Sequence, residues 1–368
     1  MGACSPQTSI GTIALAGLLA CSSESPSEEA TSEPQATVVV ERVPSAPPPT
    51  GAPVAPKKEY EPEALPDPDG PLDSLETQRE RVVARMRKMG VITSAEQAKS
   101  VAAIMSASKH IGQGNPVKTK HPMTRMACVK KRKEAGVREE RKPMCPPFMA
   151  PVYDPSREVE DEAEVCIDRY EFPGLPCEYP VTWATTKQAA ALCDAIGKRL
   201  CDAHEWEGAC AGKLRSVADE YRFGWERPVM RNSHNNKRPI LWAYGGEKDH
   251  LKCGTQSRRS PKCYASGWKH CGSNTYPSGA FPACRSRLGV YDQHGNAAEH
   301  MWLPMKPEAV GTNGTGSKPE MKGSWFIFAE HEAHTDDCRW RAPAWHDNEG
   351  RNHANYHLGF RCCADVVR

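Results

Sequence analysis

The sequence predicts a loop-rich domain that combines short helices with short strands, is held together by disulfide bonds, and follows a long unfolded N-terminal segment. Three observations lead to this prediction. The 368 residues include sixteen cysteines, too many for a chain kept in a reducing cytosol. The mean hydropathy of −0.64 and the 32 prolines indicate that a large part of the chain does not fold. After about residue 164, short runs at strand and helix spacing alternate with long polar loops.

The cysteine count favours disulfide bonds over zinc. Setting aside Cys4 and Cys21, fourteen cysteines remain, an even number that allows seven bonds. They are spread through a large domain and do not form two tidy CxxC pairs, the usual zinc pattern. Which cysteine pairs with which cannot be read from the spacing.

The charge pattern argues against a nucleic-acid partner. A formal net charge of +2 gives no global reason to expect nucleic acid or an anionic membrane surface. The basic run Lys130–Lys133 is interpreted as the solvated face of a helix rather than as a nucleic-acid site.

Residues 1–20 are interpreted as a lipoprotein signal peptide. The apolar run Ile10–Ala20 is too short to span a bilayer, and Leu18–Cys21 resembles a bacterial lipobox, whose cysteine becomes lipidated. Met1–Ile10 lacks the usual lysine or arginine, and the alternative is an apolar N-terminus without a targeting role. We expect lipidation at Cys21 and a cell-envelope protein, periplasmic or surface-exposed, whose partner is the membrane that holds the anchor.

The next three segments lead from this anchor to the C-terminal domain. Residues 21–70 are rich in Pro, Ser and Glu and are expected to form a disordered tether. Residues 71–142 are expected to form a helical arm, with one helix ending at Gly90 and a second opening at Ser94 with a capping box. Residues 143–163 form a proline-rich connector, which Cys145 is expected to pin.

Residues 164–368 carry the pattern of the main domain. Val165–Glu171 is predicted to be a strand with alternating faces, and Thr185–Ile196 a helix that Gly197 ends. Asp202 is the predicted N-cap of the next helix, with Glu205 three residues later. This cap and a buried ion pair explain Glu205 and Glu207 better than catalysis does. Leu288–Asp292 is expected to form a short strand and turn.

The long segment from Asn236 to Cys284 has little periodicity and needs covalent support. Its four cysteines are expected to staple it, because their spacings suit no common zinc module. They are Cys253, Cys263, Cys271 and Cys284.

The run Leu358–Cys363 is predicted to be a buried closing strand. Phe360 supplies an apolar anchor, Arg361 a fork of donors for a buried carboxylate, and Cys362 and Cys363 two covalent staples. Earlier in the chain, Asn296 and Glu299 flank a glycine turn with two oxygen ligands of the kind that hard cations prefer. A turn held by asparagine hydrogen bonds is the alternative.

Four short motifs in order resemble the sulfatase-modifying-factor family, which includes the formylglycine-generating enzymes. They are GKRLCDAHEWEGAC at 197–210, GNAAEH at 295–300, KGSW at 322–325 and GFRCC at 359–363. The resemblance covers about residues 164–366 and implies an α+β, C-type-lectin-like fold with little regular secondary structure. It also implies a structural calcium ion at Asn296 and Glu299, with Asn232 as a further ligand.

The resemblance also shows where catalysis would lie. Formylglycine-generating enzymes bind copper(I) through two cysteines separated by four residues, and soft thiolates suit this ion. Aligned on GFR, Cys338 falls at the first position and Pro343 at the second. Cys338 is therefore expected to be half of a disulfide. The competing possibility is a metal centre completed by nearby histidines, of which the candidates are His331, His334, His346, His353 and His357.

Two functional classes follow from this sequence. The missing second cysteine favours a non-catalytic binding module that holds a protein, a peptide or a glycan at the cell surface. The alternative is an oxidoreductase related to the formylglycine-generating enzymes, acting on a protein cysteine or a small thiol, with Cys338 as its catalytic residue.

Overall fold

The computed structural model describes residues 73–263, 267–343 and 353–367. The predicted signal peptide, Cys21, the tether and His346 lie outside these residues.

The described chain mixes helices and strands, as predicted. The helices are α1 (Leu75–Lys88), α2 (Ala95–Ser106), α3 (Arg125–Glu134), α4 (Thr186–Asp194), α5 (Ala203–Ala211), α6 (Val217–Glu220) and α7 (Arg227–Lys237), with single 3-10 turns at η1 (Glu160–Glu162), η2 (His250–Lys252) and η3 (Pro307–Ala309). The strands are β1 (Met149–Val152), β2 (Val165–Asp168), β3 (Arg199–Leu200), β4 (Ala298–Pro304), β5 (Ser317–Lys322), β6 (Leu358–Phe360) and β7 (Cys362–Asp365). Among the described helices, none is long and apolar enough to cross a membrane.

The predicted helix caps are present. Ser94 and Gln97 form the capping box of α2, and Asp202 and Glu205 form that of α5. Each pair satisfies backbone N–H groups that the first helical turn leaves without a partner. Gly90 and Gly197, at φ of 74°, follow α1 and α4 in a left-handed conformation that glycine adopts without strain.

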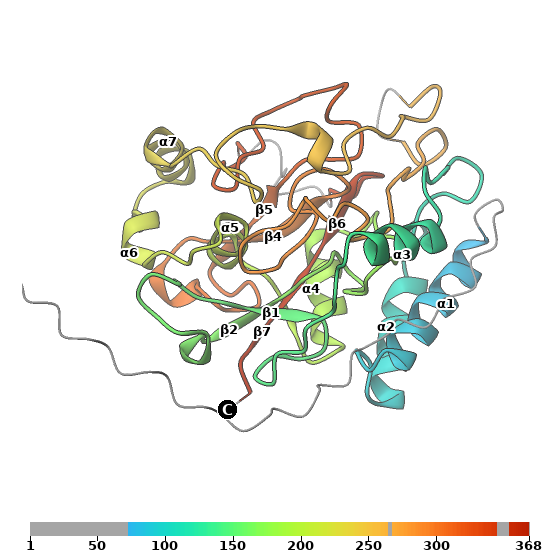
Figure 1. Cartoon of the computed structure of the whole chain (residues 1–368), viewed down its shortest axis with the longest axis horizontal. Coiled ribbons are helices and arrows are strands. Elements are labelled where there is room, and N and C mark those ends of the chain that lie inside the picture. Colours follow the sequence, from blue (N-terminus) through green and yellow to red (C-terminus); the bar gives the residue numbers. More distant parts are fainter. Residues whose placement is uncertain (1–72, 264–266, 344–352, 368) are drawn as a thin grey trace, which may run out of the picture. The chain divides into compact units, whose positions relative to one another are not determined.

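The helices predicted as an arm pack into the same hydrophobic core as the main domain. α1 and α2 lie side by side (Figure 1), and Val82 and Val101 share a buried cluster with Phe172 and Phe360. Glu178, which is fully buried, accepts hydrogen bonds from Arg85 on α1 and from Arg125 Nε on α3 at 2.7 Å.

Two small sheets form the centre of the described chain. The first has the order β1-β2-β7-β3 and is antiparallel throughout. The second has the order β5-β4-β6, with β6 parallel to β4. The closing segment therefore contributes β6 to one sheet and β7 to the other, and it is the predicted buried closing strand.

Arg361 lies between β6 and β7 and holds the two sheets together. Its Nε donates to Glu299 on β4 at 2.6 Å, and its Nη1 donates to the carbonyl oxygen of Asp168 on β2 at 3.0 Å. Next to it, Phe360 stacks on Phe172 with ring centroids 4.6 Å apart. The predicted roles of Phe360 and Arg361 are confirmed.

The fourteen cysteines within the described ranges form seven disulfide bonds. Two of these staple the long loop as predicted, and the connector is pinned through Cys145. The seven are Cys128–Cys177, Cys145–Cys166, Cys193–Cys362, Cys201–Cys363, Cys210–Cys338, Cys253–Cys284 and Cys263–Cys271.

Two local expectations differ from the structure. β2 is buried on both faces, because Ile167 packs with Ala209 of α5 while Cys166 packs under the connector with Met144. Leu288–Asp292 forms no regular strand. It is a turn, with an isolated bridge between Arg285 and Tyr291 and Gly289 at a φ of 86°.

Candidate functional site

Cys338 is part of a buried disulfide. Its partner is Cys210, on the last turn of α5, and the two residues are 0% and 1% exposed. Neither Cys362 nor Cys363 is available to it, because they pair with Cys193 and Cys201. A disulfide sulfur carries no thiolate charge, so in this state Cys338 offers copper(I) no soft anionic ligand.

A buried histidine that the sequence analysis did not consider faces this disulfide. His294 Nε2 lies 3.3 Å from Cys210 Sγ and 3.7 Å from Cys338 Sγ. The same nitrogen accepts a hydrogen bond from the Ala243 N–H at 3.0 Å, so Nδ1 carries the proton. The only sequence signal was its place immediately before the GNAAEH motif.

Asp336 lies on the other side of His294, with its Oδ2 3.8 Å from Nδ1. Burial acts to raise the pKa of Asp336, but His294 and hydrogen bonds from Trp242 and Ser324 outweigh it and hold that pKa below its usual range. An ionised carboxylate, a histidine and a disulfide are therefore aligned in the interior.

Among the described residues, the histidines near Cys338 in sequence do not gather around it. His334 stacks on Trp340 at 4.5 Å, His357 lies against Trp325 at 4.4 Å, and His353 lies 6.4 Å from His300. Within the described chain, the residue groups that could hold a metal ion are Cys210–His294–Cys338 and Cys201–Glu205–Cys363. Each depends on two cysteines that are bonded to one another, so the residues present do not fit copper.

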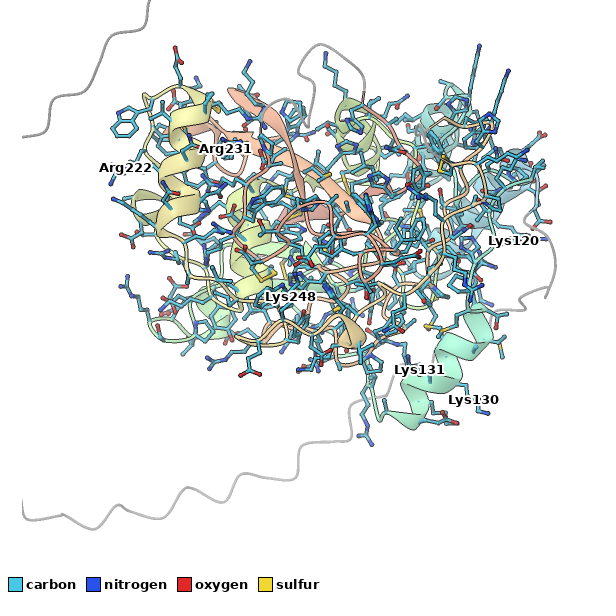
Figure 2. All side chains as sticks on the ribbon, turned by 90° about the horizontal axis from the view of Figure 1, so that it is seen from above. Lys120, Lys130, Lys131, Arg222, Arg231 and Lys248 are labelled. Carbon is cyan, nitrogen blue, oxygen red and sulfur yellow. A yellow bond between two sulfur atoms is a disulfide. The ribbon has the colours of Figure 1, made fainter. Side chains whose placement is uncertain are left out.

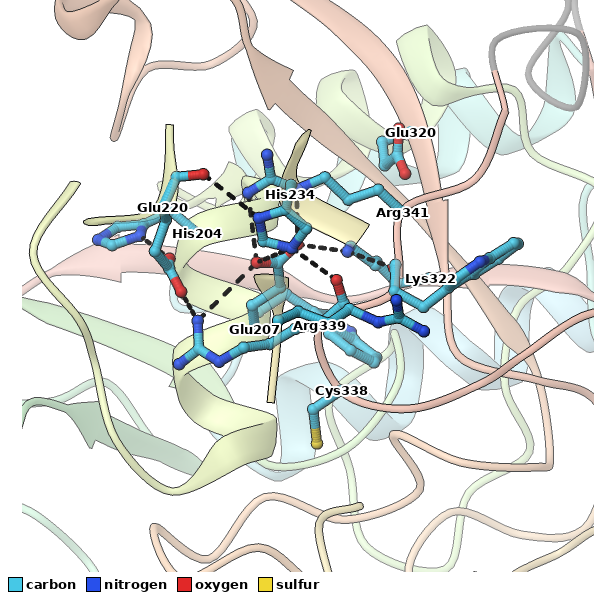
Figure 3. Close-up of polar contacts among 12 residues, drawn as sticks. His204, Glu207, Glu220, His234, Glu320, Lys322, Cys338, Arg339 and Arg341 are labelled. Atoms are coloured by element: carbon cyan, nitrogen blue, oxygen red, sulfur yellow. Dashed lines mark hydrogen bonds and ion pairs between the residues drawn. The ribbon is translucent and has the colours of Figure 1, made fainter. Parts of the chain in front are cut away.

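A buried charge network lies beside the disulfide (Figure 3). Its centre is Glu207 of α5, which accepts hydrogen bonds from Lys322 and from Arg341 Nε, the latter at 3.0 Å. Burial acts to raise the pKa of Glu207, but Arg341 and Lys322 outweigh it, so that pKa lies well below its usual range. Cys338 points away from this network in Figure 3. The network is a set of buried ion pairs, the role that the sequence predicted for Glu207.

The three predicted calcium ligands have other partners. Asn296 accepts from the Tyr276 N–H at 2.8 Å and donates to Glu171 at 2.9 Å. Glu299 accepts from Arg361 and from Trp206 Nε1, the latter at 3.0 Å. Asn232 is exposed on α7, beside Arg231. Calcium binding at these residues stays a prediction.

Carboxylates are nevertheless concentrated around Asn296. Burial, with repulsion from Asp292 and Glu299, raises the pKa of Glu171 well above its usual value. The pKa of Asp292 is raised to about 6, chiefly by burial. A bound proton or cation would reduce the electrostatic repulsion among these buried carboxylates.

A polar pocket opens on the loop side of the chain, between residues 258–262 and 327–331. We call it the basic pocket. Its volume is about 790 Å³, and it is lined by Arg258, Arg259, Ser260, Pro261, Lys262, Ile327, Glu330 and His331. Three of these residues are cationic and one is a carboxylate, so the pocket is suited to charged ligands rather than apolar ones.

Comparison with known proteins decides the family. The model of the sulfatase-modifying factor enzyme 1-like domain matches residues 173–366, more than half of the chain. The chain belongs to this family. No curated protein matches it.

Among solved structures, two variants of a protein named Major Tropism Determinant are similar, I1 and P3c. Both are 14% identical to this family member, with TM-scores of 0.30 and 0.29, and 61% of this chain is covered in each case. The chain spans about half, 54%, of the length of each. Likeness at this level carries no argument about function.

This family member departs from the two-cysteine copper-binding pattern at the second position, and its cysteine at the first position is not free. Cys338 is disulfide-bonded, and Pro343, which is half-buried, has no side-chain atom that can bind a metal.

Proposed function

We propose that this protein is a non-catalytic binding module of the cell envelope, lipidated at Cys21 and built on a C-type-lectin-like version of the family fold. One observation carries the proposal. The cysteine at the first copper-binding position is buried in the Cys210–Cys338 disulfide, and a proline occupies the second position. Two short sheets joined by long stapled loops support the lectin-like architecture.

The test is incubation of the oxidised protein with a sulfatase-type peptide that contains the substrate cysteine, with and without copper(I). We expect mass spectrometry to find no conversion of the cysteine to formylglycine. The variant Pro343→Cys should also be inactive, because Cys338 remains bonded to Cys210. A thiol-to-aldehyde mass change with the wild-type protein would overturn the proposal.

The anchor has a separate test. Cys21→Ser should move the protein from the membrane fraction to the soluble fraction, because a single lipid-bearing residue is the proposed attachment. Cys4→Ser is the matched control and should leave the protein in the membrane fraction. Retention of the Cys21→Ser variant on membranes would refute the anchor.

We keep a structural calcium ion near Asn296 as part of the proposal, supported by the buried carboxylates of Glu171 and Asp292. A calcium chelator should then lower the melting temperature by mass action. An unchanged melting temperature would leave the hydrogen bonds of Asn296 and the Arg361–Glu299 pair as the full account of this region.

A second candidate, an oxidoreductase that exchanges thiols with a partner, is favoured by His294 beside the disulfide. Two substrate thiols would be oxidised to a disulfide with release of two protons, while Cys210–Cys338 would take up both electrons and two protons to become two thiols. Alkylation of Cys210 and Cys338 after incubation with a reduced dithiol peptide would support this candidate. Their protection from alkylation supports the binding module.

A further inference from the structure

We propose that the basic pocket binds an acidic saccharide, a sugar ligand that carries carboxylate groups together with hydroxyl groups. This inference rests on the binding-module function proposed above and names its ligand class. It is argued from the charges, the rigidity and the mixed chemistry of the pocket.

The charges of the pocket are concentrated and mostly unused by the fold. Arg258, Arg259 and Lys262 contribute three positive charges and Glu330 one negative charge, in a chain whose formal net charge is only +2. Within the residues that the structure describes, the side chains of Arg258, Lys262 and Glu330 form no ion pair. A guanidinium can donate two parallel N–H bonds to one carboxylate, so two adjacent arginines suit carboxylate groups on neighbouring units of a ligand.

The two walls of the basic pocket are fixed to each other. The Ser257 N–H donates to the Phe326 carbonyl at 2.7 Å, and the Ala329 N–H donates to the Thr255 carbonyl at 3.2 Å. Asn274 Nδ2 donates a hydrogen bond to the Arg258 carbonyl oxygen at 2.6 Å. Because the backbone that carries the cationic side chains is already ordered, ligand binding costs less conformational entropy than it would in a flexible loop.

The remaining groups favour a sugar over a purely anionic ligand. Glu330 would repel a polyanion, but its oxygens can accept hydrogen bonds from hydroxyl groups. His331 lines the same pocket with its ring stacked on Trp325, with centroids 6.2 Å apart, and offers a flat face to a sugar ring. An acidic saccharide supplies carboxylates, hydroxyls and a ring in one molecule, whereas a peptide of acidic residues supplies carboxylates and backbone N–H donors but no hydroxyl group and no sugar ring.

The experiment is titration calorimetry with a galacturonate oligomer, and with the same oligomer after methyl esterification of its carboxylates. We expect the free acid to bind with an affinity that falls as salt is raised, and the ester to bind at least about tenfold more weakly. The variant Arg258→Gln/Arg259→Gln should lose about tenfold or more in affinity for the free acid. Equal binding of the acid and the ester would overturn the proposal.

The matched control is Lys130→Gln/Lys133→Gln. It removes the same charge from exposed positions on α3, where Figure 2 shows Lys130 projecting from the helix. It should bind the galacturonate oligomer as the wild type does. An equal loss in this control would mean that general charge, not the basic pocket, attracts the ligand, and the proposal would fail.

Glu330→Gln separates a sugar from other anions. It should strengthen binding of a glutamate peptide more than binding of a galacturonate oligomer of equal charge, because repulsion is relieved for both ligands but only the oligomer loses a carboxylate acceptor for its hydroxyl groups. An equal gain for both ligands, or tighter binding of the peptide than of the oligomer by the wild type, would identify an acidic-peptide site and overturn the saccharide proposal. Failure of the oligomer to bind would leave the binding-module function standing, since that function is tested by the cysteine-to-formylglycine assay.

Discussion

At the scale of single residues, the stability of the centre depends on charges that are buried in pairs. Arg361 and Glu299 are each about 1% exposed, and each nitrogen of the arginine side chain donates to Glu299 or to the carbonyl oxygen of Asp168 or Tyr291. Removing one partner from such a pair leaves the other charge buried without compensation.

Arg361→Met tests this dependence. We expect the free energy of unfolding to fall by about 3–5 kcal/mol, because Glu299 is left as an isolated buried carboxylate. Denaturant unfolding under oxidising conditions measures the change. Arg222→Met, at an exposed position labelled in Figure 2, should change stability by about 0.5 kcal/mol or less. Equal effects of the two variants would contradict the role given to Arg361.

His121 should make the protein sensitive to acid. Burial lowers its pKa to about 3, its Nδ1–H donates to the Thr275 carbonyl at 2.8 Å, and its Nε2 is buried without a hydrogen-bond partner. Because the folded-state pKa lies below that of the unfolded chain, its stabilising contribution is complete above about pH 6.5. As the pH falls from 6.5 toward 3, the contribution is lost at up to about 1.4 kcal/mol per pH unit.

His121→Phe keeps the ring that stacks on Tyr179 and removes the titration. The variant should be less stable by about 1 kcal/mol near pH 7, because the hydrogen bond to Thr275 is lost. Its stability should fall less steeply below pH 6.5, so this difference should shrink and then reverse as the pH falls. Melting temperatures from pH 7 to pH 4 provide the measurement. A pH profile parallel to that of the wild type would exclude His121 as the source.

At the scale of elements, the closing segment is the part of the fold that sequence reasoning described best. The roles of Phe360 and Arg361 could be predicted because an apolar anchor and a fork of donors near a chain end have few alternative uses. The caps of α2 and α5 could be predicted because capping is a local interaction. The partner of Cys338 and the position of His294 could not, because both depend on contacts between segments that are far apart in sequence.

The disulfides of the closing segment should matter more than those of the loop. Cys193–Cys362 and Cys201–Cys363 join residues 169 and 162 positions apart, whereas Cys263–Cys271 spans 8. Closing a longer loop restricts the unfolded chain more, so Cys201→Ala/Cys363→Ala should cost about 2–5 kcal/mol and more than Cys263→Ala/Cys271→Ala. Thermal unfolding measures both double variants, and a reversed order would show that local packing outweighs chain entropy.

At the scale of the molecule, the position of the family domain could be predicted from the sequence. Which other residues fold cooperatively with that domain could not. Residues 71–142 are polar enough to resemble an appendage, yet Val82 and Val101 contribute to the main core and Arg85 and Arg125 neutralise the buried Glu178. A stripe of a few apolar residues on a short helix predicts that this face of the helix is buried. It does not predict which part of the protein covers that face.

Deletion of residues 73–142 should therefore prevent folding of the rest. Glu178 would lose both arginines, and Cys177 would lose Cys128. We expect the shortened protein to lack a cooperative thermal transition. The same deletion combined with Cys177→Ala should give the same result. This control would show that the unpaired thiol of Cys177 is not the cause. A cooperative transition in either variant would show that residues 143–367 fold alone.

The adjacent cysteines Cys362 and Cys363 also have a consequence for how the protein matures. Cys193 and Cys201 emerge from the ribosome long before their partners, which follow 169 and 162 residues later. Until then the two early thiols have no native partner, and under oxidising conditions they can pair with each other. Once the late pair arrives, each of its sulfurs can attack either early one, since only one peptide bond separates them. A host without an enzyme that reshuffles disulfides should therefore accumulate more of the Cys193–Cys201 form than a host that has one.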